Sequence, residues 1–255
     1  MRTVVKVGTS TLAYATGHLN IRHMEKLCRV LSDLKNAGHE MILVSSGAVG
    51  MGMGRLSLSE RPSELTMKQA VSAVGQCELM YTYDKLFSEY NHTVAQILLS
   101  ADDVNDPEHR SNFIATLNKL LELGVLPVIN ENDSVSTDEF GIGDNDTLAA
   151  IVAANSGAEL LILLTDIDGL YTADPNKDPD AKRISVVPEI TDEIKALAGD
   201  ANSAMGTGGM KTKLTAAEIA TAAGCNMFIA NGTDPEILYN IMEGKSVGTK
   251  FIGKK

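Results

Sequence analysis

Six short apolar runs, separated by longer amphipathic segments, constrain the fold of this chain more than any other feature. The runs are apolar at nearly every position, which is typical of parallel strands that are covered on both faces. Repeated strand–helix–strand order predicts one mostly parallel sheet with helices on both sides. The expected strands are Val4–Val7, Glu40–Val44, Thr93–Leu98, Val125–Ile129, Leu160–Leu164 and Asn226–Ala230.

Five of the intervening segments have the periodicity of helices. Glycine directly follows four of them, and glycine is the residue that most often ends a helix in the left-handed conformation. We therefore expect an α/β fold with these helices between the strands. The expected helices are Ile21–Ala37, Thr66–Tyr90, Arg110–Leu123, Asp146–Ser156 and Lys213–Ala223, and the glycines are Gly38, Gly124, Gly157 and Gly224.

The 255 residues are enough for one large α/β domain, which we expect over residues 1–255. A change in composition near Ser156 divides it into two halves, each led by a strand. Two segments lack periodicity: Tyr171–Ile184 is expected to be an irregular surface loop, and the glycine-rich Leu197–Met210 a mobile loop. No internal repeat or low-complexity linker interrupts the chain.

Charge and composition exclude several classes of protein. The net charge of −11 disfavours binding to nucleic acid or to an anionic membrane surface, and the longest apolar run is too short to span a bilayer. The chain starts directly with a strand rather than a signal peptide, so a cytoplasmic location is expected. The three cysteines have no disulfide or metal spacing and are expected to be buried apolar residues: Cys28, Cys77 and Cys225.

The first candidate site lies where the first strand ends, at Lys6, Gly8, Thr9 and Ser10. Glycine lets the backbone approach an anion closely, and lysine supplies the compact positive charge that phosphoryl transfer needs. A P-loop pattern is absent. A solvated lysine at the end of a strand is therefore the alternative interpretation.

The second candidate site is Ser46 and Gly47, at the end of the next parallel strand. The carboxyl ends of neighbouring parallel strands lie side by side, where open α/β sheets bind ligands, although an ordinary strand–helix turn is the alternative. The following Gly50, Gly52 and Gly54 predict a flexible or tightly bent segment. They do not form the dinucleotide fingerprint, which disfavours a nicotinamide-dependent dehydrogenase.

Two acid–amide clusters follow, Asn130–Asp133 after a strand and Asp144–Asp146 before a helix. Asp144 or Asn145 could be only a helix cap. So dense a set favours an ammonium-bearing substrate, a magnesium–phosphate complex or a lysine that must be oriented.

Two further motifs lie in the second half of the chain, and the second of them points to a phosphate site. Thr165 and Asp166 end a buried strand, and the glycine-rich run Thr207–Lys213 opens a helix. The start of a helix attracts anions, so a glycine-rich loop there predicts phosphate binding. Lys213 is unfavourable for helix stability at this position, which favours a functional role.

Taken in order, these motifs resemble the amino acid kinase family over essentially the whole chain. The motifs are K-x-G-T-S, S-S-G-A, N-E-N-D, G-D-N-D, L-T-D-x-x-G-L-Y-T-A-D-P and G-T-G-G-M-x-T-K. The resemblance implies a three-layer αβα sandwich. It also implies transfer of a phosphoryl group from ATP, with Mg2+, to the γ-carboxylate of L-glutamate, as in proline biosynthesis. Residues 1–156 would bind glutamate and residues 157–255 ATP.

The resemblance also implies roles for individual residues. Lys6 and Lys213 would contact the transferring phosphoryl group, and Asp144 would orient the lysines or a magnesium shell; no protein metal ligand and no general base are expected. Asp133 and Asp146 would hold the substrate ammonium, and Ser46 and Asn145 its carboxylates. The implied substrate contacts are Ser46, Gly47, Asp133, Asn145 and Asp146. The implied ATP contacts are Lys6, Gly8, Thr165, Asp166, Thr207, Gly208, Gly209, Met210, Lys211, Thr212 and Lys213.

Because the chain ends at Lys255, the RNA-binding-like (PUA) domain of many family members is expected to be absent. A homo-oligomer (dimer or tetramer) and feedback inhibition by proline are also expected. The open alternatives are a kinase of the same fold acting on N-acetylglutamate, aspartate, carbamate or a nucleoside monophosphate, and a non-catalytic nucleotide-binding protein. The presence of both Lys6 and Lys213 argues against the latter.

Overall fold

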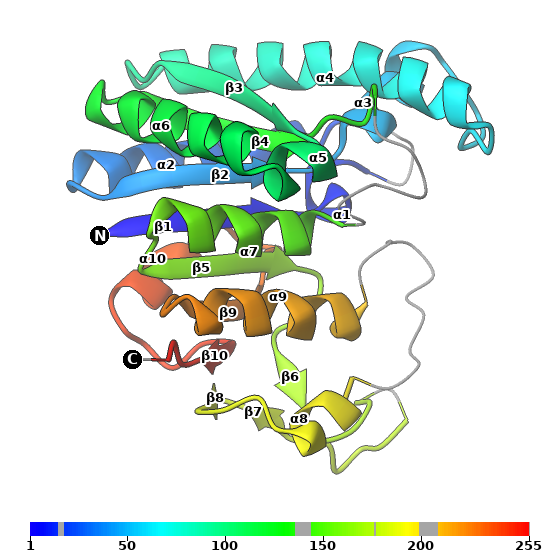
Figure 1. Cartoon of the computed structure of the whole chain (residues 1–255). Helices are drawn as coiled ribbons and strands as arrows, with labels where there is room; N and C mark the ends of the chain where they lie inside the picture. The colour runs from blue at the N-terminus through cyan, green and yellow to red at the C-terminus, as the bar shows by residue number, and fades with distance from the viewer. Residues whose placement is uncertain (15–17, 136–143, 176, 199–208, 255) are drawn as a thin grey trace.

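A mixed sheet of eight strands organises the computed structural model, which describes residues 1–14, 18–135, 144–175, 177–198 and 209–254 (Figure 1). The strand order is β3-β4-β2-β1-β5-β9-β10-β8. The strands are β1 (Arg2–Val7), β2 (Glu40–Ser45), β3 (Val94–Leu99), β4 (Leu126–Glu131), β5 (Leu160–Thr165), β8 (Val186–Val187), β9 (Asn226–Asn231) and β10 (Thr249–Phe251).

The six expected strands form the parallel part of this sheet, which confirms the prediction. The sequence patterns missed β10, which is antiparallel to β9, and β8, which is parallel to β10. Both are two or three residues long, so they are too short to show a periodic pattern.

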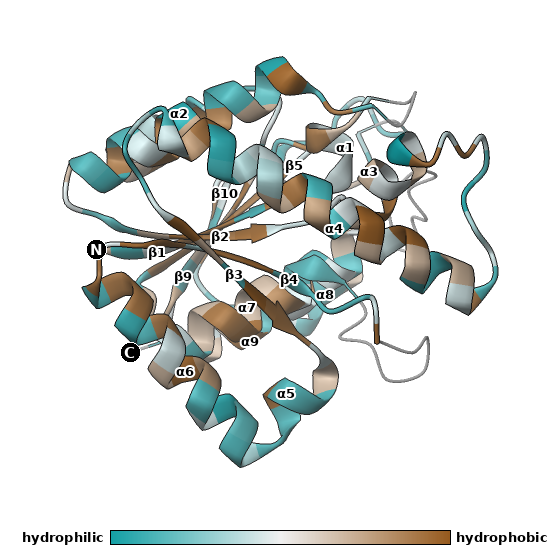
Figure 2. Ribbon diagram, turned by 90° about the horizontal axis from the view of Figure 1, so that it is seen from above, coloured by the Kyte–Doolittle hydropathy of each residue, from teal (hydrophilic) through white to brown (hydrophobic). Residues whose placement is uncertain are grey.

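Helices cover both faces of the sheet, as Figure 2 shows: α6, α7 and α9 lie on one side and α2 and α4 on the other. The expected three-layer αβα sandwich is therefore confirmed. All five expected helices are present, and α1, α3, α5, α8 and α10 are additional short ones. The bounds are α1 (Thr9–Leu12), α2 (Ile21–Asn36), α3 (Ala48–Arg55), α4 (Leu65–Ser88), α5 (Ala101–Asn105), α6 (Pro107–Glu122), α7 (Asn145–Ser156), α8 (Asp192–Ala196), α9 (Met210–Ala222) and α10 (Ile237–Met242).

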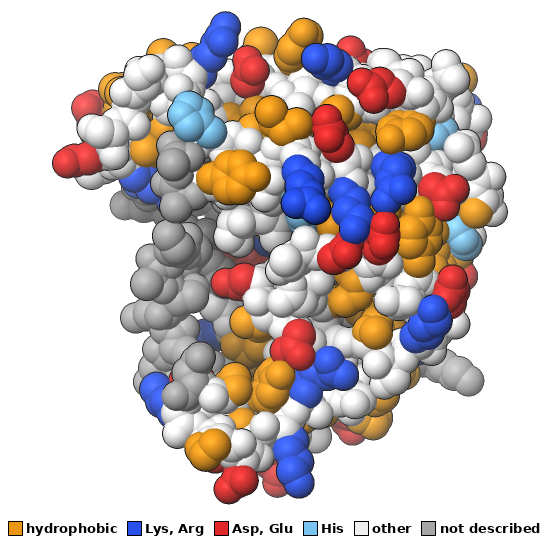
Figure 3. Space-filling model, turned by 180° about the vertical axis from the view of Figure 1, so that it is seen from behind, with side chains coloured by type: hydrophobic (Ala, Val, Ile, Leu, Met, Phe, Trp, Pro, Cys, Tyr) orange, Lys and Arg blue, Asp and Glu red, His pale blue; other side chains and the backbone are white. Residues whose placement is uncertain are grey.

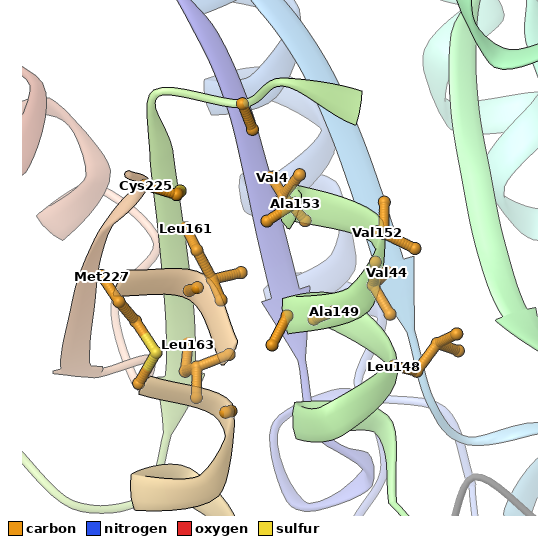
Figure 4. Packing of buried hydrophobic residues seen from close by; sticks show 14 of the residues in the cluster. Val4, Val44, Leu148, Ala149, Val152, Ala153, Leu161, Leu163, Cys225 and Met227 are labelled. Carbon is orange, nitrogen blue, oxygen red and sulfur yellow. The ribbon is translucent and has the colours of Figure 1, made fainter. Parts of the chain in front are cut away.

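Two hydrophobic layers lie on the two faces of the sheet, and the strands contribute alternate residues to each. In β5, Leu161 and Leu163 pack on the side of α7 and α9, whereas Ile162 packs on the side of α2 and α4. Figure 4 shows Ala153 of α7 next to Val4 of β1 on the first side. This two-sided burial explains why the strands are apolar at nearly every position.

The glycines after Ser46 and Gly47 form a helix, so the prediction of a flexible or bent segment was wrong. This helix, α3, crosses α4 at very short range. A Cβ atom on Gly52 would lie 1.9 Å from the carbonyl oxygen of Val71, and one on Gly75 would lie 1.7 Å from that of Ala48. Gly52 and Gly75 are therefore required for close packing of the two helices.

Four other expectations have mixed outcomes. The glycines that end α2, α6, α7 and α9 all have positive φ, which confirms the predicted caps. Tyr171–Ile184 is not wholly irregular, because β6 (Leu170–Tyr171) pairs with β7 (Arg183–Ile184). Most of Leu197–Met210 lies outside the described residues. Cys28 and Cys225 are buried as expected, but Cys77 is exposed on α4, so that part of the cysteine prediction was wrong.

Charges of both signs are mixed on the face opposite α7 and α9 (Figure 3). On that side of the sheet, Lys26 of α2 pairs with Asp234, and Arg29 pairs with Glu236. No helix formed by the described residues has both the length and the apolar character needed to cross a bilayer.

Candidate active site

The candidate site lies at the carboxyl ends of β1, β2, β4 and β5, beside the starts of α7 and α9 (Figure 1). Because these strands are parallel, the polar residues that follow them meet at one edge of the sheet. The sites predicted from separate motifs are brought together here.

A buried carboxylate joins the two lysines. The Nζ atom of Lys6 lies 2.7 Å from Oδ1 of Asp146, and the Nζ atom of Lys213 lies 3.1 Å from Oδ2. The exposed fractions of the side chains are 12% for Lys6, 2% for Asp146 and 7% for Lys213. Asp146 thus holds two ammonium groups close together, and ammonium groups in such an arrangement suit an anionic ligand.

Opposing effects set the charge state of Asp146. Burial by itself raises the pKa of this carboxyl group, but the charges and hydrogen bonds of Lys6 and Lys213 outweigh burial and hold its pKa below the usual value for aspartate. Asp146 is therefore ionised at neutral pH and keeps both lysines in place. Gly8 lies beside this group, because a Cβ atom on it would be 3.6 Å from Nζ of Lys6.

Asp144 has a different position from the one expected. Its Oδ1 accepts hydrogen bonds from the backbone N–H groups of Asp146 (2.8 Å) and Thr147 (2.9 Å), and its Oδ2 accepts one from the hydroxyl group of Thr147. Asp144 thus caps α7, the alternative that the sequence left open. The carboxylate that contacts the lysines is that of Asp146, with one oxygen on each ammonium group.

The residues expected to contact the substrate are organised around Asn145. Its Nδ2 donates to Oγ of Ser46 (2.7 Å), to the carbonyl oxygen of Ser45 (3.1 Å) and to Oδ1 of Asn130 (3.1 Å). Gly47 has a φ of +104° and turns the chain into α3. The structure therefore brings Ser46, Gly47 and Asn145 together. Asn130 belongs to the N-E-N-D motif, but the sequence analysis did not predict it as a site residue.

Asp133 lies near this group, at a cavity of about 460 Å³. Its Oδ2 accepts a hydrogen bond from the hydroxyl group of Ser72 at 3.0 Å. Burial raises the pKa of Asp133, while the bond from Ser72 and the charge of Arg61 lower it less strongly. Gln76 also lines the cavity. Sequence reasoning missed Ser72 and Gln76, because both stand inside a long helix without any motif.

The residues expected to contact the nucleotide lie on the other side of the lysines. Thr165 donates to Oδ1 of Asp166 at 2.9 Å, and Nδ2 of Asn231 donates to the carbonyl oxygen of Asp166 at 3.2 Å. β9, which ends at Asn231, runs beside β5, so both strands end at this edge of the sheet. Asn231 carried no motif and was missed.

The start of α9 completes the group. Gly209 is its N-cap residue, and no described side chain caps this helix start. Its first backbone N–H groups are thus suited to an anion. Met210, Lys211 and Thr212 form the first turn with Lys213, and the hydroxyl group of Thr212 donates to the carbonyl oxygen of Gly209. Thr207 and Gly208 lie outside the described residues.

Comparison with known proteins assigns the chain to a family. Residues 1–231 match the model of the amino acid kinase family. The chain belongs to the amino acid kinase family. It is 51% identical to the glutamate 5-kinase of Clostridium perfringens strain 13, an alignment that covers 100% of this chain and 96% of that protein. It is 52% identical to the glutamate 5-kinase of Clostridium tetani over 97% of this chain and 93% of that protein.

The amino acid kinase fold is also evident from solved structures. The isopentenyl phosphate kinase of T. acidophilum in its product complex superimposes with a TM-score of 0.69 at 17% identity, covering 98% of this chain and 100% of that one. This similarity concerns the fold alone. The architecture of the αβα sandwich is therefore that of the family.

Proposed function

We propose that this amino acid kinase is a glutamate 5-kinase. It transfers the γ-phosphoryl group of ATP to the γ-carboxylate of L-glutamate, which yields ADP and L-glutamyl 5-phosphate, the first step of proline biosynthesis from glutamate. The observation that carries the proposal is the buried pair of lysines held by Asp146, directly beside an acid–amide cluster that suits an amino acid.

The chemistry needs positive charge more than it needs a base. A substrate carboxylate is already ionised and nucleophilic, so no proton has to be removed before it attacks phosphorus. Negative charge spreads over the equatorial oxygens of the transferring group, and preorganised cations stabilise it. Lys6 and Lys213 provide these cations from opposite sides of Asp146, which holds their ammonium groups without displacing an incoming phosphate.

The acceptor site follows from the remaining polar groups. The carboxylate of Asp133 binds the ammonium group of glutamate, and the hydroxyl group of Ser46 and the backbone at Gly47 bind its carboxylates. The resemblance implied an ammonium contact for Asp146 as well, but because both its oxygens face lysines, we assign the ammonium group to Asp133. Residues 1–156 supply the glutamate site, and residues 157–255 supply the ATP site together with Lys6 and Gly8.

The nucleotide side uses Gly8, Thr165, Asp166 and the run Thr207–Lys213. Within the described parts of the chain, no three His, Cys, Asp or Glu side chains gather to hold a metal ion. Mg2+ is usually held by the phosphates of its substrate together with one or two carboxylates, so it would reach this site bound to ATP.

The decisive experiment combines ADP release with trapping of the product by hydroxylamine, because an acyl phosphate gives a hydroxamate. Glutamate, N-acetylglutamate, aspartate, carbamate and a nucleoside monophosphate are tested as acceptors. We expect turnover and hydroxamate with glutamate. Turnover with another acceptor, but not with glutamate, would assign the chain to a different kinase of the same fold.

Three further properties belong to the proposal. The enzyme is a homo-oligomer, it is inhibited by proline competing near the glutamate site, and it works in the cytoplasm. The unpaired state of Cys28, Cys77 and Cys225 supports a reducing compartment. Light scattering after size-exclusion chromatography tests the first property, and glutamate titrations at several proline concentrations test the second.

A further inference from the structure

We propose that Gln76, on α4, is a positioning residue for the acceptor site: it holds the amide of Asn145 in one orientation through the amide of Asn130. The inference rests on the proposed kinase function. It concerns a residue outside every motif of the sequence and without contact to the lysines.

Four side-chain amides from four elements form a continuous row. Nδ2 of Asn145 donates to Oδ1 of Asn130 at 3.1 Å, and Nδ2 of Asn130 donates to Oε1 of Gln76 at 2.9 Å. Nε2 of Gln76 then donates to Oε1 of Gln96 at 3.1 Å. The row leads from α7 through β4 and α4 to β3.

Backbone groups determine the direction of this row. The carbonyl oxygen of Ser45 can only accept a hydrogen bond, so the atom of Asn145 at 3.1 Å from it is the nitrogen. The backbone N–H of Glu131 can only donate, so the atom of Asn130 at 2.9 Å from it is the oxygen. Asn130 therefore donates a hydrogen bond from its nitrogen, and Gln76 must accept this bond with its side-chain oxygen.

This direction decides what the site presents to a substrate. The two hydrogens on Nδ2 of Asn145 are shared among Ser45, Ser46 and Asn130, so the carbonyl oxygen Oδ1 is the atom of Asn145 left for a ligand. Oδ1 suits an ammonium group rather than a carboxylate. Because Oγ of Ser46 accepts from Asn145, its own proton can donate to a substrate carboxylate. Asn145 thus faces the substrate ammonium group rather than the carboxylates expected from the resemblance.

Burial makes Gln76 necessary for this arrangement. Asn130 is only 2% exposed and Gln76 only 9% exposed. Without the oxygen of Gln76, the buried nitrogen of Asn130 would lack a partner, and Asn130 would have to shift to recover one. Such a shift would also loosen Asn145, which shares Oδ1 of Asn130 with the backbone of Glu131.

The test replaces Gln76 in two ways in the full-length enzyme. Gln76→Met keeps the approximate length of the side chain but removes the hydrogen bond, and we expect KM for glutamate to rise about tenfold or more while KM for ATP stays within about twofold. Gln76→Glu keeps an oxygen facing Asn130, and the exposed Gln96 can turn its own amide to match. This variant is expected to keep KM for glutamate within about threefold of wild type.

A second variant distinguishes a specific effect of Gln76 on Asn145 from a general loss of protein stability. Leu79→Ala removes a fully buried apolar side chain from the same helix, so it lowers Tm while leaving KM for glutamate unchanged. If Gln76→Met does not fold, Gln76→Ala carries the same expectation. The proposal is wrong if both KM values rise together, if KM for glutamate does not change in Gln76→Met, or if Gln76→Glu is as impaired as Gln76→Met.

Failure of the role proposed for Gln76 can be told apart from failure of the proposed glutamate 5-kinase activity. Wild-type enzyme that produces no hydroxamate from glutamate, but uses another acceptor, contradicts glutamate as substrate. The same comparison of KM for that acceptor with KM for ATP still tests Gln76. Calorimetric titration of wild type and Gln76→Met with the accepted substrate adds a binding measurement that does not depend on turnover.

Discussion

Lys213 and Asp146 form a buried ion pair, with 3.1 Å between Nζ and Oδ2, although they belong to the first turns of two different helices. A lysine in the first turn of a helix opposes the helix dipole. The packing of α7 against α9 supplies the carboxylate that compensates for this cost. The pair therefore stabilises the helix start and at the same time keeps an ammonium group at the site.

Lys213→Ala should remove most of the turnover. The variant loses one of the two cations that stabilise the transferring group, so kcat is expected to fall by about a hundredfold or more. A coupled ADP-release assay measures it. Lys119→Ala is the matched control, because Lys119 is exposed on α6 and pairs with Glu122 one turn along the same helix. A variant of Lys213 with unchanged kcat would contradict the role assigned to it.

Asp146→Asn should destabilise the protein as well as inactivate it. The substitution removes the carboxylate that contacts both Lys6 and Lys213, and removing one partner of a buried ion pair costs about 3–5 kcal/mol. Urea unfolding measures the change. Asp144→Asn is the comparison, because an amide oxygen can still cap α7, and its expected cost is below about 1 kcal/mol. Equal losses in the two variants would contradict the different positions of the two carboxylates.

The contribution of the Asp146 carboxylate to the free energy of unfolding should disappear in acid. Its pKa in the folded protein is lower than the usual 3.8, because Lys6 and Lys213 outweigh the effect of burial. A lowered folded pKa adds stability in full above the unfolded pKa, and this stability is lost as pH falls from that value through the folded pKa. The difference in unfolding free energy between wild type and Asp146→Asn should therefore be constant near neutral pH and shrink below about pH 4. A difference that grows on acidification would contradict a lowered pKa of Asp146 in the folded protein.

Asp133→Asn should weaken glutamate binding while it raises the stability of the free protein. Burial raises the pKa of Asp133, so keeping this carboxylate ionised at neutral pH destabilises the free protein. The variant is expected to be more stable than wild type without substrate. Its KM for glutamate should rise by roughly tenfold to a hundredfold, because a charge-assisted bond to the ammonium group is lost. Thermal unfolding and steady-state kinetics on the same preparation measure both, and a variant that is less stable with unchanged KM would contradict this role.

Gly75→Ala should disturb the acceptor site from a distance. The new methyl group would lie 1.7 Å from the carbonyl oxygen of Ala48, so α3 has to move away from α4. Overpacking of this kind costs about 1–3 kcal/mol, and it displaces the turn that contains Ser46 and Gly47. Unfolding and KM for glutamate are measured together. Gly50→Ala on α3 is the control, because its methyl group would lie at an ordinary contact distance of 3.6 Å from Thr9.

Residue patterns alone predict the parallel sheet, its five main helices and the edge of the sheet at which the candidate site lies. These features depend on local patterns: two-sided apolar strands such as β5, glycine ends such as Gly157, and polar residues directly after strands. β8 and β10 escaped prediction, because strands this short depend on pairing with distant segments rather than on periodicity.

Only the tertiary structure shows which side chains contact one another within the candidate site. Asp144 and Asp146 stand two residues apart in one motif, yet only the placement of α7 beside β1 and α9 turns Asp146 towards the lysines and leaves Asp144 at the helix cap. Gln76 meets Asn130 because α4 packs beside β4, although 54 residues separate them. Local residue patterns specify which elements form, whereas the direction of a buried side chain depends on partners that only the packed elements bring within hydrogen-bonding distance.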